Sequence, residues 1–577
     1  MYWKRHKGRG PAASHYAREF SINELTAQVL LNRGFNGLES MQSVLTPDMQ
    51  GLPDPFSMRH MDTAVRRVRR AIKKRERIHI HGDYDVDGVT STSVVLIALR
   101  TLGADVHYHV INRNDAAVGL SVQSLRRDHL PDNPTLIITT DCGTSNNTAI
   151  DEARTHGIDV VVIDHHHPGT FLPRCAALLN PQQPKCRFEE KYLAAVGVAF
   201  QFVRALDSFL QREDGAWPKI NLEALTDLVA LGTISDLVPL VGMNRVMVHY
   251  GLDLLRSARR PGICALMRAA RMIDPYDANA DLTDVVTARS IGFRIAPLLN
   301  AAGRMNDANK CVELLSTESF RTADAIAREL VLANTQRQSC ERDVLVEALA
   351  VADAQRAAGS PVIVLANANW HPGVLGIVAS RLVEKHNVPS LVAFTDESGM
   401  SKGSVRSPDG IDMLEALRSC RDLLETFGGH RVAAGVAFKE QGIDELRARL
   451  GRHVAGQIPD GETLQRELSI DATVPLQDLH APIVRELTRL APFGAGHPEP
   501  LFEACGVTPV QARAVNGRNV RLRLRQGSKT WQAFAFGMGP RVEELRRPVD
   551  IVFHPRLVRH GGDTRVELVL RDFTPSR

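Results

Sequence analysis

The sequence predicts an α/β fold with a parallel, helix-covered sheet, then a second α/β unit and a β-rich C-terminal region. Between residues 55 and about 260, short apolar runs alternate with helical segments, as in parallel strands joined by helices. Several of these runs are followed directly by aspartate or histidine. Ligands bind such sheets beyond the carboxyl ends of the strands, so these polar positions also predict the site.

The elements follow from local patterns. Apolar runs predict strands at 78–81, 105–111, 135–140 and 159–163. Helices are expected at 89–101 and 146–156, where Gly103 and Gly157 end them. Residues 304–358 contain neither glycine nor proline, and their apolar residues recur at helical spacing, which predicts one or two long helices.

A second α/β unit is expected from a strand at 361–365, a helix at 373–386 and a strand at 390–394. After about residue 457 alternating apolar and polar residues predict a β-rich region. The 577 residues are 44% hydrophobic and 24% charged, which is ordinary for a globular protein. No apolar run reaches the roughly 18 residues of a membrane span, so no membrane association is expected.

The N-terminal residues are basic without an apolar segment behind them, which predicts a mobile arm and not a secretory signal. The eight cysteines are dispersed and contain no Cys-x-x-Cys pair. This distribution favours a cytoplasmic protein over a disulfide scaffold or a zinc site. The net charge of +4 is too small to identify a partner.

Clustered carboxylates and histidines at the expected strand ends predict a metal centre. Carboxylates this close repel one another unless cations neutralise them. A solvated acidic turn is the alternative for the first segment taken alone. The predicted ligands, each at the end of a strand, are His81, Asp85, Asp87, Asp141, His165 and Asp236. Mostly oxygen ligands with imidazole suit two Mn²⁺ or Mg²⁺ ions, which can support phosphoryl chemistry.

His166 is not needed as a metal ligand, and we predict that it contacts the scissile phosphate. Asp164 and Asp83 are predicted to complete the catalytic group, Asp83 from behind the ligands. Arg113, and Ser404 with Arg406, are predicted to hold a terminal phosphate, since arginine binds phosphate bidentately. Surface ion pairs are the alternative for these arginines. His430 follows two glycines that allow close approach to a phosphate, although a plain tight turn would look the same.

The run from Asn519 to Arg525 alternates arginine with apolar residues. In a strand, Arg521, Arg523 and Arg525 would line one face, and with Trp531 nearby they predict a groove for single-stranded nucleic acid. A solvated edge strand is the alternative.

Four segments, 83–88, 141–145, 164–166 and 227–236, resemble the motifs of the DHH phosphoesterase superfamily. Segments 292–297, 300–305 and 370–374 resemble the RecJ single-strand-specific exonucleases of that superfamily. Segment 428–435 resembles the DHH-associated domain, and 492–496 opens the region where RecJ carries an OB-fold. Related phosphoesterases favour Asp236 over Asp227 as the fourth-motif ligand, with Asp227 structural, and the resemblance adds Arg304 to the substrate-binding residues.

The resemblance implies an α/β protein with five parts: a basic N-terminal arm and lead-in (1–54), a DHH catalytic domain (55–312), a long connecting helix (313–358), a DHH-associated substrate-binding domain (359–456) and an OB-fold-like nucleic-acid-binding domain (457–577). It also implies a monomeric 5′→3′ exonuclease that releases 5′-mononucleotides from single-stranded DNA in repair and recombination. Expected partners are a single-stranded-DNA-binding protein and a helicase.

Two other functions remain open at this point. A DHH phosphodiesterase acting on short oligoribonucleotides or a cyclic dinucleotide would keep the chemistry, but it would need neither the long helix nor a basic C-terminal domain. A non-catalytic DNA-binding scaffold would have no reason to retain costly clustered carboxylates.

Overall fold

The computed structural model describes residues 1–8, 10–113, 119–213, 217–273, 282–305, 307–458, 465–560 and 563–576. The chain divides into two compact units. One unit contains residues 53–236 and 250–465, and the other contains residues 1–52, 237–249 and 466–577. In the described part of the chain, no helix has both the length and the apolar character needed to cross a membrane.

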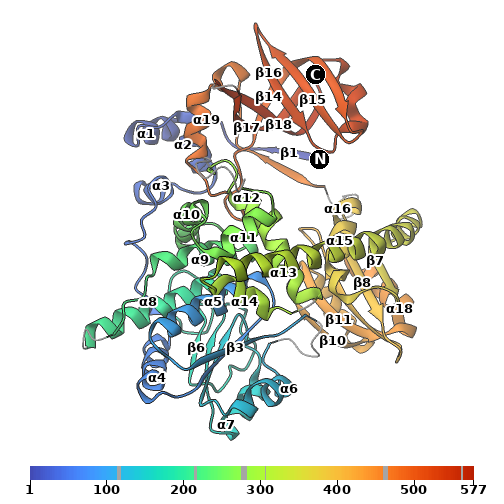
Figure 1. Ribbon diagram of the computed structural model, residues 1–577. Coiled ribbons are helices and arrows are strands. Elements are labelled where there is room, and N and C mark those ends of the chain that lie inside the picture. Colours follow the sequence, from blue (N-terminus) through green and yellow to red (C-terminus); the bar gives the residue numbers. More distant parts are fainter. Residues whose placement is uncertain are drawn as a thin grey trace. The chain divides into compact units, whose positions relative to one another are not determined.

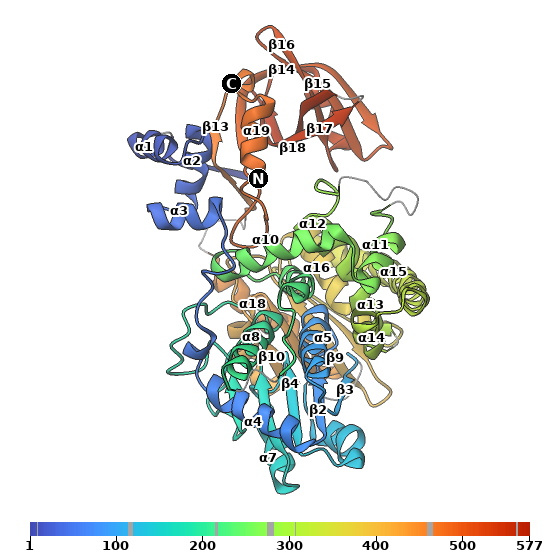
Figure 2. The same cartoon turned by 60° about the vertical axis from the view of Figure 1, so that its left-hand side comes forward.

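The first sheet of the larger unit is entirely parallel and has the strand order β3-β2-β4-β5-β6. Its strands are β2 (Ile78–Gly82), β3 (Val106–Val110), β4 (Leu136–Thr140), β5 (Asp159–Ile163) and β6 (Ala177–Leu179). β2 and β4 are buried along their whole length, which explains their nearly continuous apolar character. Figure 2 shows β4, β2 and β3 next to one another, with α5 (Val86–Thr101) beside them. The predicted α/β fold with a parallel sheet is confirmed.

Further helices of the chain lie on this sheet or pack on neighbouring helices. They are α4 (Met61–Lys74), α6 (Val122–Ser124), α7 (Asn147–Thr155), α8 (Ala195–Glu213), α9 (Thr226–Ser235), α11 (Pro261–Ala269), α12 (Ala288–Ser290), α13 (Ala296–Met305) and α14 (Asn309–Ser316). A further helix, α10 (Gly242–Ser257), includes residues of both units. α5 packs on α8 and α9, and its side chains are buried nearly all round. The helix α5 is therefore held by packing along most of its surface.

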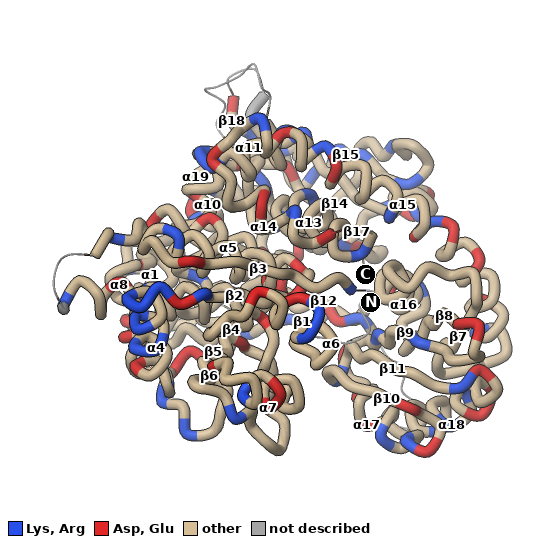
Figure 3. Tube along the Cα trace, turned by 60° about the horizontal axis from the view of Figure 1, so that its bottom comes forward, with Lys and Arg blue, Asp and Glu red and all other residues tan. Residues whose placement is uncertain are grey.

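The basic helix α4 is an amphipathic surface helix. Val65, Val68 and Ile72 are buried, while Arg66 pairs with Asp62 one turn away. Figure 3 shows Lys and Arg interspersed with Asp and Glu along the trace. The basic residues of this helix thus lie on its solvent-exposed face, as in other amphipathic surface helices.

A long helix, α15 (Phe320–Ala357), runs from α13 to the second sheet (Figure 1). That sheet has the order β10-β11-β9-β8-β7, in which only β7 and β8 are parallel. Its strands are β7 (Ile363–Asn367), β8 (Ser390–Thr395), β9 (Met400–Arg406), β10 (Leu424–Gly429) and β11 (Ala433–Lys439). Helices α16 (Leu375–His386), α17 (Met413–Ser419) and α18 (Ile443–Gly456) belong to the same part.

The smaller unit contains an OB-like barrel. Its strands are β13 (Ala472–Thr473), β14 (Phe502–Val515), β15 (Asn519–Gln526), β16 (Lys529–Ala535), β17 (Val549–His560) and β18 (Asp563–Pro575). The order β13-β14-β15-β16-β18-β17 closes on itself because β14 also pairs with β17. Helix α19 (Ala481–Thr488) packs on β17 and β18.

The N-terminal segment is folded into the smaller unit, so the expectation of a mobile arm is wrong. β1 (Tyr2–Arg5) pairs in parallel with β12 (Glu467–Ile470), and Arg5 donates two hydrogen bonds to the Glu503 carboxylate. Helices α1 (Pro11–Glu19), α2 (Glu24–Asn32) and α3 (Leu38–Leu45) bury apolar side chains in the core that the barrel shares. The basic residues hid the strand, because its backbone partner lies more than 400 residues away along the chain.

Candidate active site

Three strands of the first sheet each end directly before an aspartate. Asp83 follows β2, Asp141 follows β4 and Asp164 follows β5. The backbone N–H of Asp141 donates to Ile163 O at 2.9 Å, and that of Asp164 donates to Leu179 O at 3.0 Å. The hydrogen bonds between neighbouring strands therefore continue one residue past the strand ends, and they fix the backbone positions of these aspartates. Asp141 also has a left-handed backbone with φ 62°, a conformation that non-glycine residues adopt mainly under strong local constraint.

The first turn of α5 brings two further carboxylates. Asp85 caps the helix by accepting the Gly88 N–H at 3.1 Å. Asp87 accepts the N–H groups of Ala195 and Val196 at 2.6 and 2.9 Å, where α8 begins. Asp87 thus ties two helix N-termini together, an arrangement that favours a negative charge.

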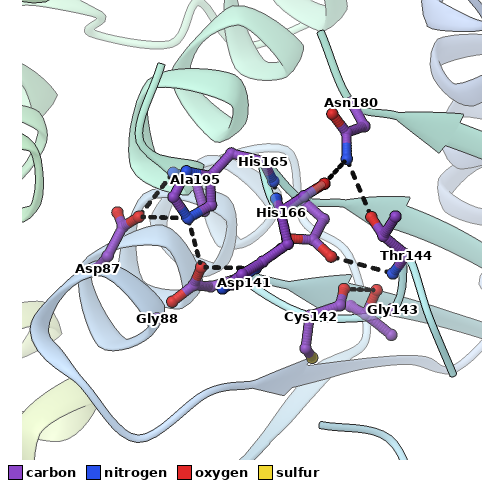
Figure 4. Close-up of polar contacts among 12 residues, drawn as sticks. Asp87, Gly88, Asp141, Cys142, Gly143, Thr144, His165, His166, Asn180 and Ala195 are labelled. Carbon is purple, nitrogen blue, oxygen red and sulfur yellow. Dashed lines mark hydrogen bonds and ion pairs between the residues drawn. The ribbon is translucent and has the colours of Figure 1, made fainter. Parts of the chain in front are cut away.

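His165 lies among carboxylates from three elements. Its Nε2 is 3.3 Å from Asp141 Oδ1 and 3.9 Å from Asp87 Oδ2, and its Nδ1 is 3.7 Å from Asp236 Oδ2. Figure 4 shows the ring between Asp87 and Asp141. Within the described residues, three groups have donor atoms close enough to share an ion: Asp83 with Asp85 and Asp141, Asp87 with His165 and Asp236, and Asp141 with His165 and His166.

The electrostatics of these groups fit bound cations. Burial, followed by repulsion from neighbouring carboxylates, raises the pKa of Asp83, Asp87, Asp141 and Asp236 well above the usual range. Asp141 Oδ1 and Asp83 Oδ1 are buried and accept no hydrogen bond from the described protein atoms. Such a cluster is costly unless cations neutralise it. Oxygen donors with one or two imidazoles suit Mn²⁺ or Mg²⁺.

Asp164 and His166 form a hydrogen-bonded pair beside the cluster. His166 Nδ1 lies 2.8 Å from Asp164 Oδ1, and Asp164 also accepts the N–H groups of Thr144, His165 and His166. Burial alone would raise the pKa of Asp164, but the hydrogen bond from His166 and these further contacts hold it far below the usual range. Burial opposes the charge on His166, and the bond to Asp164 outweighs it, raising the His166 pKa to about 9.

Two side-chain amides hold the loop of residues 164–166, and the sequence analysis does not predict them. The buried Asn180 donates from Nδ2 to His166 O at 2.8 Å and to Thr144 Oγ1 at 3.0 Å. Gln182 donates from Nε2 to His165 O at 2.5 Å, and its N–H donates to Asn180 Oδ1. The available signal was that Asn180, like the aspartates, directly follows a buried strand.

His81 does not join the metal cluster, so its predicted place among the ligands is wrong. Its Nδ1 lies 2.9 Å from His129 Nε2, and its ring stacks on His109 with 6.1 Å between centroids. None of the ligand groups found among the described residues contains it. Strand alternation explains the error: His79 and His81 share a face of β2, and both rings contact His129 beside that face.

Asp236 and Asp227 lie at opposite ends of α9, so the expectation that Asp236 ends a strand is also wrong. Asp236 is the C-cap of the helix and belongs to the ligand group with His165. Asp227 accepts two hydrogen bonds from the Arg260 guanidinium, at 2.7 and 2.9 Å. The ion pair with Arg260 gives Asp227 a structural role, as expected. Asp236, at the other end of the helix, lies beside the ligand cluster.

Arginines from both α/β parts of the larger unit meet near Tyr84. Arg113 Nη1 lies 3.1 Å from the Tyr84 hydroxyl, and Arg113 Nη2 lies 3.4 Å from Ser404 Oγ. Burial, followed by the charge of Arg113, lowers the pKa of Arg406. The same two causes lower the pKa of Arg304 to about 10. Among the described residues, no carboxylate forms an ion pair with these three arginines. Half-buried, mutually repelling guanidiniums of this kind predict an anionic ligand.

His430 lies in the turn between β10 and β11, where its N–H donates to Ala433 O at 2.7 Å. Burial lowers the pKa of His430, and the charges of His166 and His167 lower it further. His430 is therefore within electrostatic range of the loop that follows β5.

In the smaller unit, the arginines of β15 alternate as the sequence predicts. Arg521, Arg523 and Arg525 are exposed, whereas Val520, Leu522 and Leu524 are buried. The placement of Trp531 beside them is wrong: it is 8% exposed and packs in the core. Trp531 pairs with Leu524, so the register of β15 and β16 turns both side chains inward.

Three family models match the chain: the DHH family N-terminal domain at residues 77–233, the DHHA1 domain at residues 359–456 and the RecJ OB domain at residues 470–572. The chain is 35% identical over 573 residues to a RecJ single-stranded-DNA-specific exonuclease of Dickeya dadantii, covering 96% of each protein. It is also 35% identical over 542 residues to the RecJ of Bacillus subtilis, covering 93% of this chain and 66% of that one.

Solved structures agree with these matches. The crystal structure of Thermus thermophilus RecJ in complex with Mn²⁺ matches with a TM-score of 0.84 and 31% identity, covering 100% of this chain and 80% of that one. The Mg²⁺ complex of the same protein matches with a TM-score of 0.77 and 30% identity, covering 100% of this chain and 79% of that one. The resemblance inferred from the motifs is confirmed, and the chain belongs to the RecJ family of single-stranded-DNA-specific exonucleases.

Proposed function

We propose that this protein is a metal-dependent exonuclease that hydrolyses single-stranded DNA from the 5′ end and releases 5′-mononucleotides, in DNA repair and recombination. The observation that carries the proposal is the cluster that the buried Asp87 and Asp141 form with the half-buried His165 and Asp236, in a chain of the RecJ family. Family membership favours this function over an enzyme for short oligoribonucleotides or cyclic dinucleotides. The cost of burying these carboxylates argues against a non-catalytic scaffold.

In this proposal, two Mn²⁺ or Mg²⁺ ions are held by Asp85, Asp87, Asp141, His165 and Asp236, with Asp83 beside them. Bound ions of this kind activate water and stabilise the charge that develops on a phosphoryl group. The chain contributes the fixed positions: Asp85 and Asp87 are anchored on the first turn of α5, and Asp141 directly follows β4.

His166 would donate a hydrogen bond to the scissile phosphate. Its raised pKa keeps the ring protonated at neutral pH, and its exposed side lies beside the ligand cluster. Asp164 fixes which ring nitrogen faces the substrate by accepting from Nδ1. A protonated imidazole aimed at the developing charge stabilises the transition state more than the bound substrate.

The polarity of digestion would come from the arginine cluster. A terminal 5′-phosphate carries more charge than an internal one, and Arg113, Ser404 and Arg406 offer donors from both parts of the larger unit. Arg304, which donates to Gly373 O at 3.0 Å, would add a further positive charge. His430 would contact the strand near the scissile phosphate.

Arg521, Arg523 and Arg525 would neutralise phosphates of the strand at some distance from its end. All eight cysteines are free thiols, which is compatible with a cytoplasmic location. A monomeric state, a single-stranded-DNA-binding protein and a helicase remain predictions drawn from the family.

The test is degradation of strands labelled at the 5′ or the 3′ end, supplied as single-stranded DNA, duplex DNA and RNA with Mn²⁺. A labelled mononucleotide should appear at once from 5′-labelled single-stranded DNA, and late from the 3′-labelled strand. Asp141→Ala should remove turnover while retaining strand binding. Equal release from both ends, or normal turnover by Asp141→Ala, would refute the proposal.

A further inference from the structure

An aromatic pair lies next to the arginine row of the barrel. Arg521 on β15 is directly opposite Arg513 on β14 and Phe534 on β16. Side chains directly opposite in neighbouring strands project from the same face, so these three form one row across three strands. Phe536 follows two residues after Phe534, and the two ring centroids are 4.6 Å apart with the planes tilted by 59°.

Phe534 and Phe536 are not part of the barrel core. Phe536 is 61% exposed and Phe534 is half-buried, whereas Trp531, Ala533 and Ala535 of the same strand point inward. The backbone that carries Phe536 is held in place, because the next N–H, that of Gly537, donates to Asn519 Oδ1 at 3.0 Å. The outer ring is therefore presented to solvent from a fixed position, with the inner ring supporting it.

The charge on this face is not balanced by nearby acids. Like charges directly opposite each other in a sheet are destabilising, yet Arg513 and Arg521 occupy such a pair. In the described part of the chain, no carboxylate pairs with Arg513 or with the row formed by Arg521, Arg523 and Arg525. Other arginines of the same unit do have partners, such as Arg5 with Glu503 and Arg541 with Asp572. Unbalanced guanidiniums beside exposed rings fit an anionic ligand that also has flat apolar groups.

We propose that Phe534 and Phe536 form a base-stacking platform for single-stranded DNA, whose phosphates run over Arg513 and the β15 arginines. The inference rests on the proposed function and adds the binding site for the bases. Aromatic stacking suits any base, since every base has a flat face, and it requires bases that are not already paired and stacked in a duplex. The platform would thus favour single strands, while the arginines supply affinity without regard to strandedness.

The experiment uses the full chain carrying Asp141→Ala, so that the strand is not digested. Binding is measured by fluorescence anisotropy at several salt concentrations. The probes are a thymidine oligonucleotide of about 30 nucleotides and an abasic strand of the same length, long enough to span an OB domain. The variant Phe534→Leu/Phe536→Leu keeps apolar side chains but removes both flat faces.

The double variant should lose roughly tenfold or more in affinity for the thymidine strand, keep the slope of log Kd against log salt, and bind the abasic strand like the parent. By contrast, replacing Arg521, Arg523 and Arg525 with Gln should flatten the salt slope by roughly two units on both probes. Val558→Ala changes another exposed apolar residue of the unit and should alter neither probe.

Unchanged affinity of the leucine variant for the thymidine strand, or an equal loss on the abasic strand, would overturn the platform. If the double variant melts at a lower temperature, Phe536→Leu alone decides, because that ring is mostly exposed. Failure of the proposed function would look different: the protein with Asp141 intact would not digest single-stranded DNA, whatever the leucine variants bind.

Discussion

Asp164 accepts a hydrogen bond from His166 Nδ1 at 2.8 Å and, through the same oxygen, the backbone N–H groups of both His165 and His166. The buried Asp164 carboxylate therefore fixes the backbone of residues 165 and 166 and stabilises the positive charge of His166. It links the position of a metal-ligand candidate, His165, to that of its neighbour, which would contact the phosphate.

Asp164→Asn should lower kcat by roughly 100-fold, the upper range for residues that orient functional groups. The raised pKa of His166, about 9, depends on the carboxylate. Without it the ring loses its proton at lower pH, so the alkaline limb of the kcat profile should move to lower pH. His167→Gln is the control, since His167 lies outside the pair and should keep the profile. An alkaline limb that does not move in Asp164→Asn would contradict the role of the pair.

Asn180→Ala should lower kcat by about tenfold or more with little change in KM, because its amide holds the His166 carbonyl and Thr144 in place without lining the substrate site. Gln182→Ala removes only the contact to the His165 carbonyl and should have a smaller effect. Steady-state kinetics beside thermal melting separates the possibilities. A lower melting temperature with unchanged kcat would make Asn180 merely structural.

Asp236→Asn should stabilise the metal-free protein at pH 8. Burial and nearby carboxylates raise the pKa of Asp236 to about 9, so between pH 4 and 9 the folded state binds more protons than the unfolded state. Stability is then lost as the pH rises through this window, and an amide avoids the loss. Mn²⁺ should reverse the order, since it stabilises the protein with the stronger site.

Asp227→Asn is the matched control for that measurement. Asp227 is buried more deeply than Asp236, but it is paired with Arg260, so its replacement should destabilise the protein with or without metal. The two variants are compared by thermal melting in EDTA from pH 5 to pH 9. A pH-independent effect of Asp236→Asn would contradict the electrostatic account.

Arg406→Ala should raise KM for 5′-phosphorylated strands by roughly tenfold or more, because a charge-assisted contact to the terminal phosphate is lost. KM for 5′-hydroxyl strands should change much less, because they do not make this contact. Lys402→Ala, on the same strand β9 but exposed, is the control. Initial rates on the two substrates decide. Equal losses would mean that Arg406 serves the fold or a general grip on the backbone.

Trp531→Ala should destabilise the smaller unit by about 3–5 kcal/mol, as expected for removing a large buried aromatic side chain. Its indole packs in the core, so the salt dependence of DNA binding should stay unchanged at temperatures where the unit is folded. Denaturant unfolding and binding measured in parallel test this. A selective loss of binding without loss of stability would restore Trp531 to the DNA-binding face.

The sequence by itself determined the features that depend on neighbouring residues along the chain. The buried strands β2, β4 and β5 were evident as apolar runs, and Asp141 and His165 lie just beyond the ends of β4 and β5, as expected, because the positions after such a strand are fixed by the backbone. The inward and outward faces of β15 likewise follow from strict alternation, whatever the strand pairs with.

Only the tertiary structure decided the features that depend on pairing between distant segments. The sequence predicts His81 as a ligand because it does not show that the His81 face of β2 meets His129. The sequence predicts the wrong face for Trp531 because the register of β16 against β15, not the composition of either strand, turns Trp531 inward and Phe534 outward. The sequence does not reveal the role of Asn180, because its amide contacts a loop that only the pairing of β6 with β5 brings within reach. Alternation and strand ends are local consequences of backbone geometry, whereas register and contact partners are set by the folded chain as a whole.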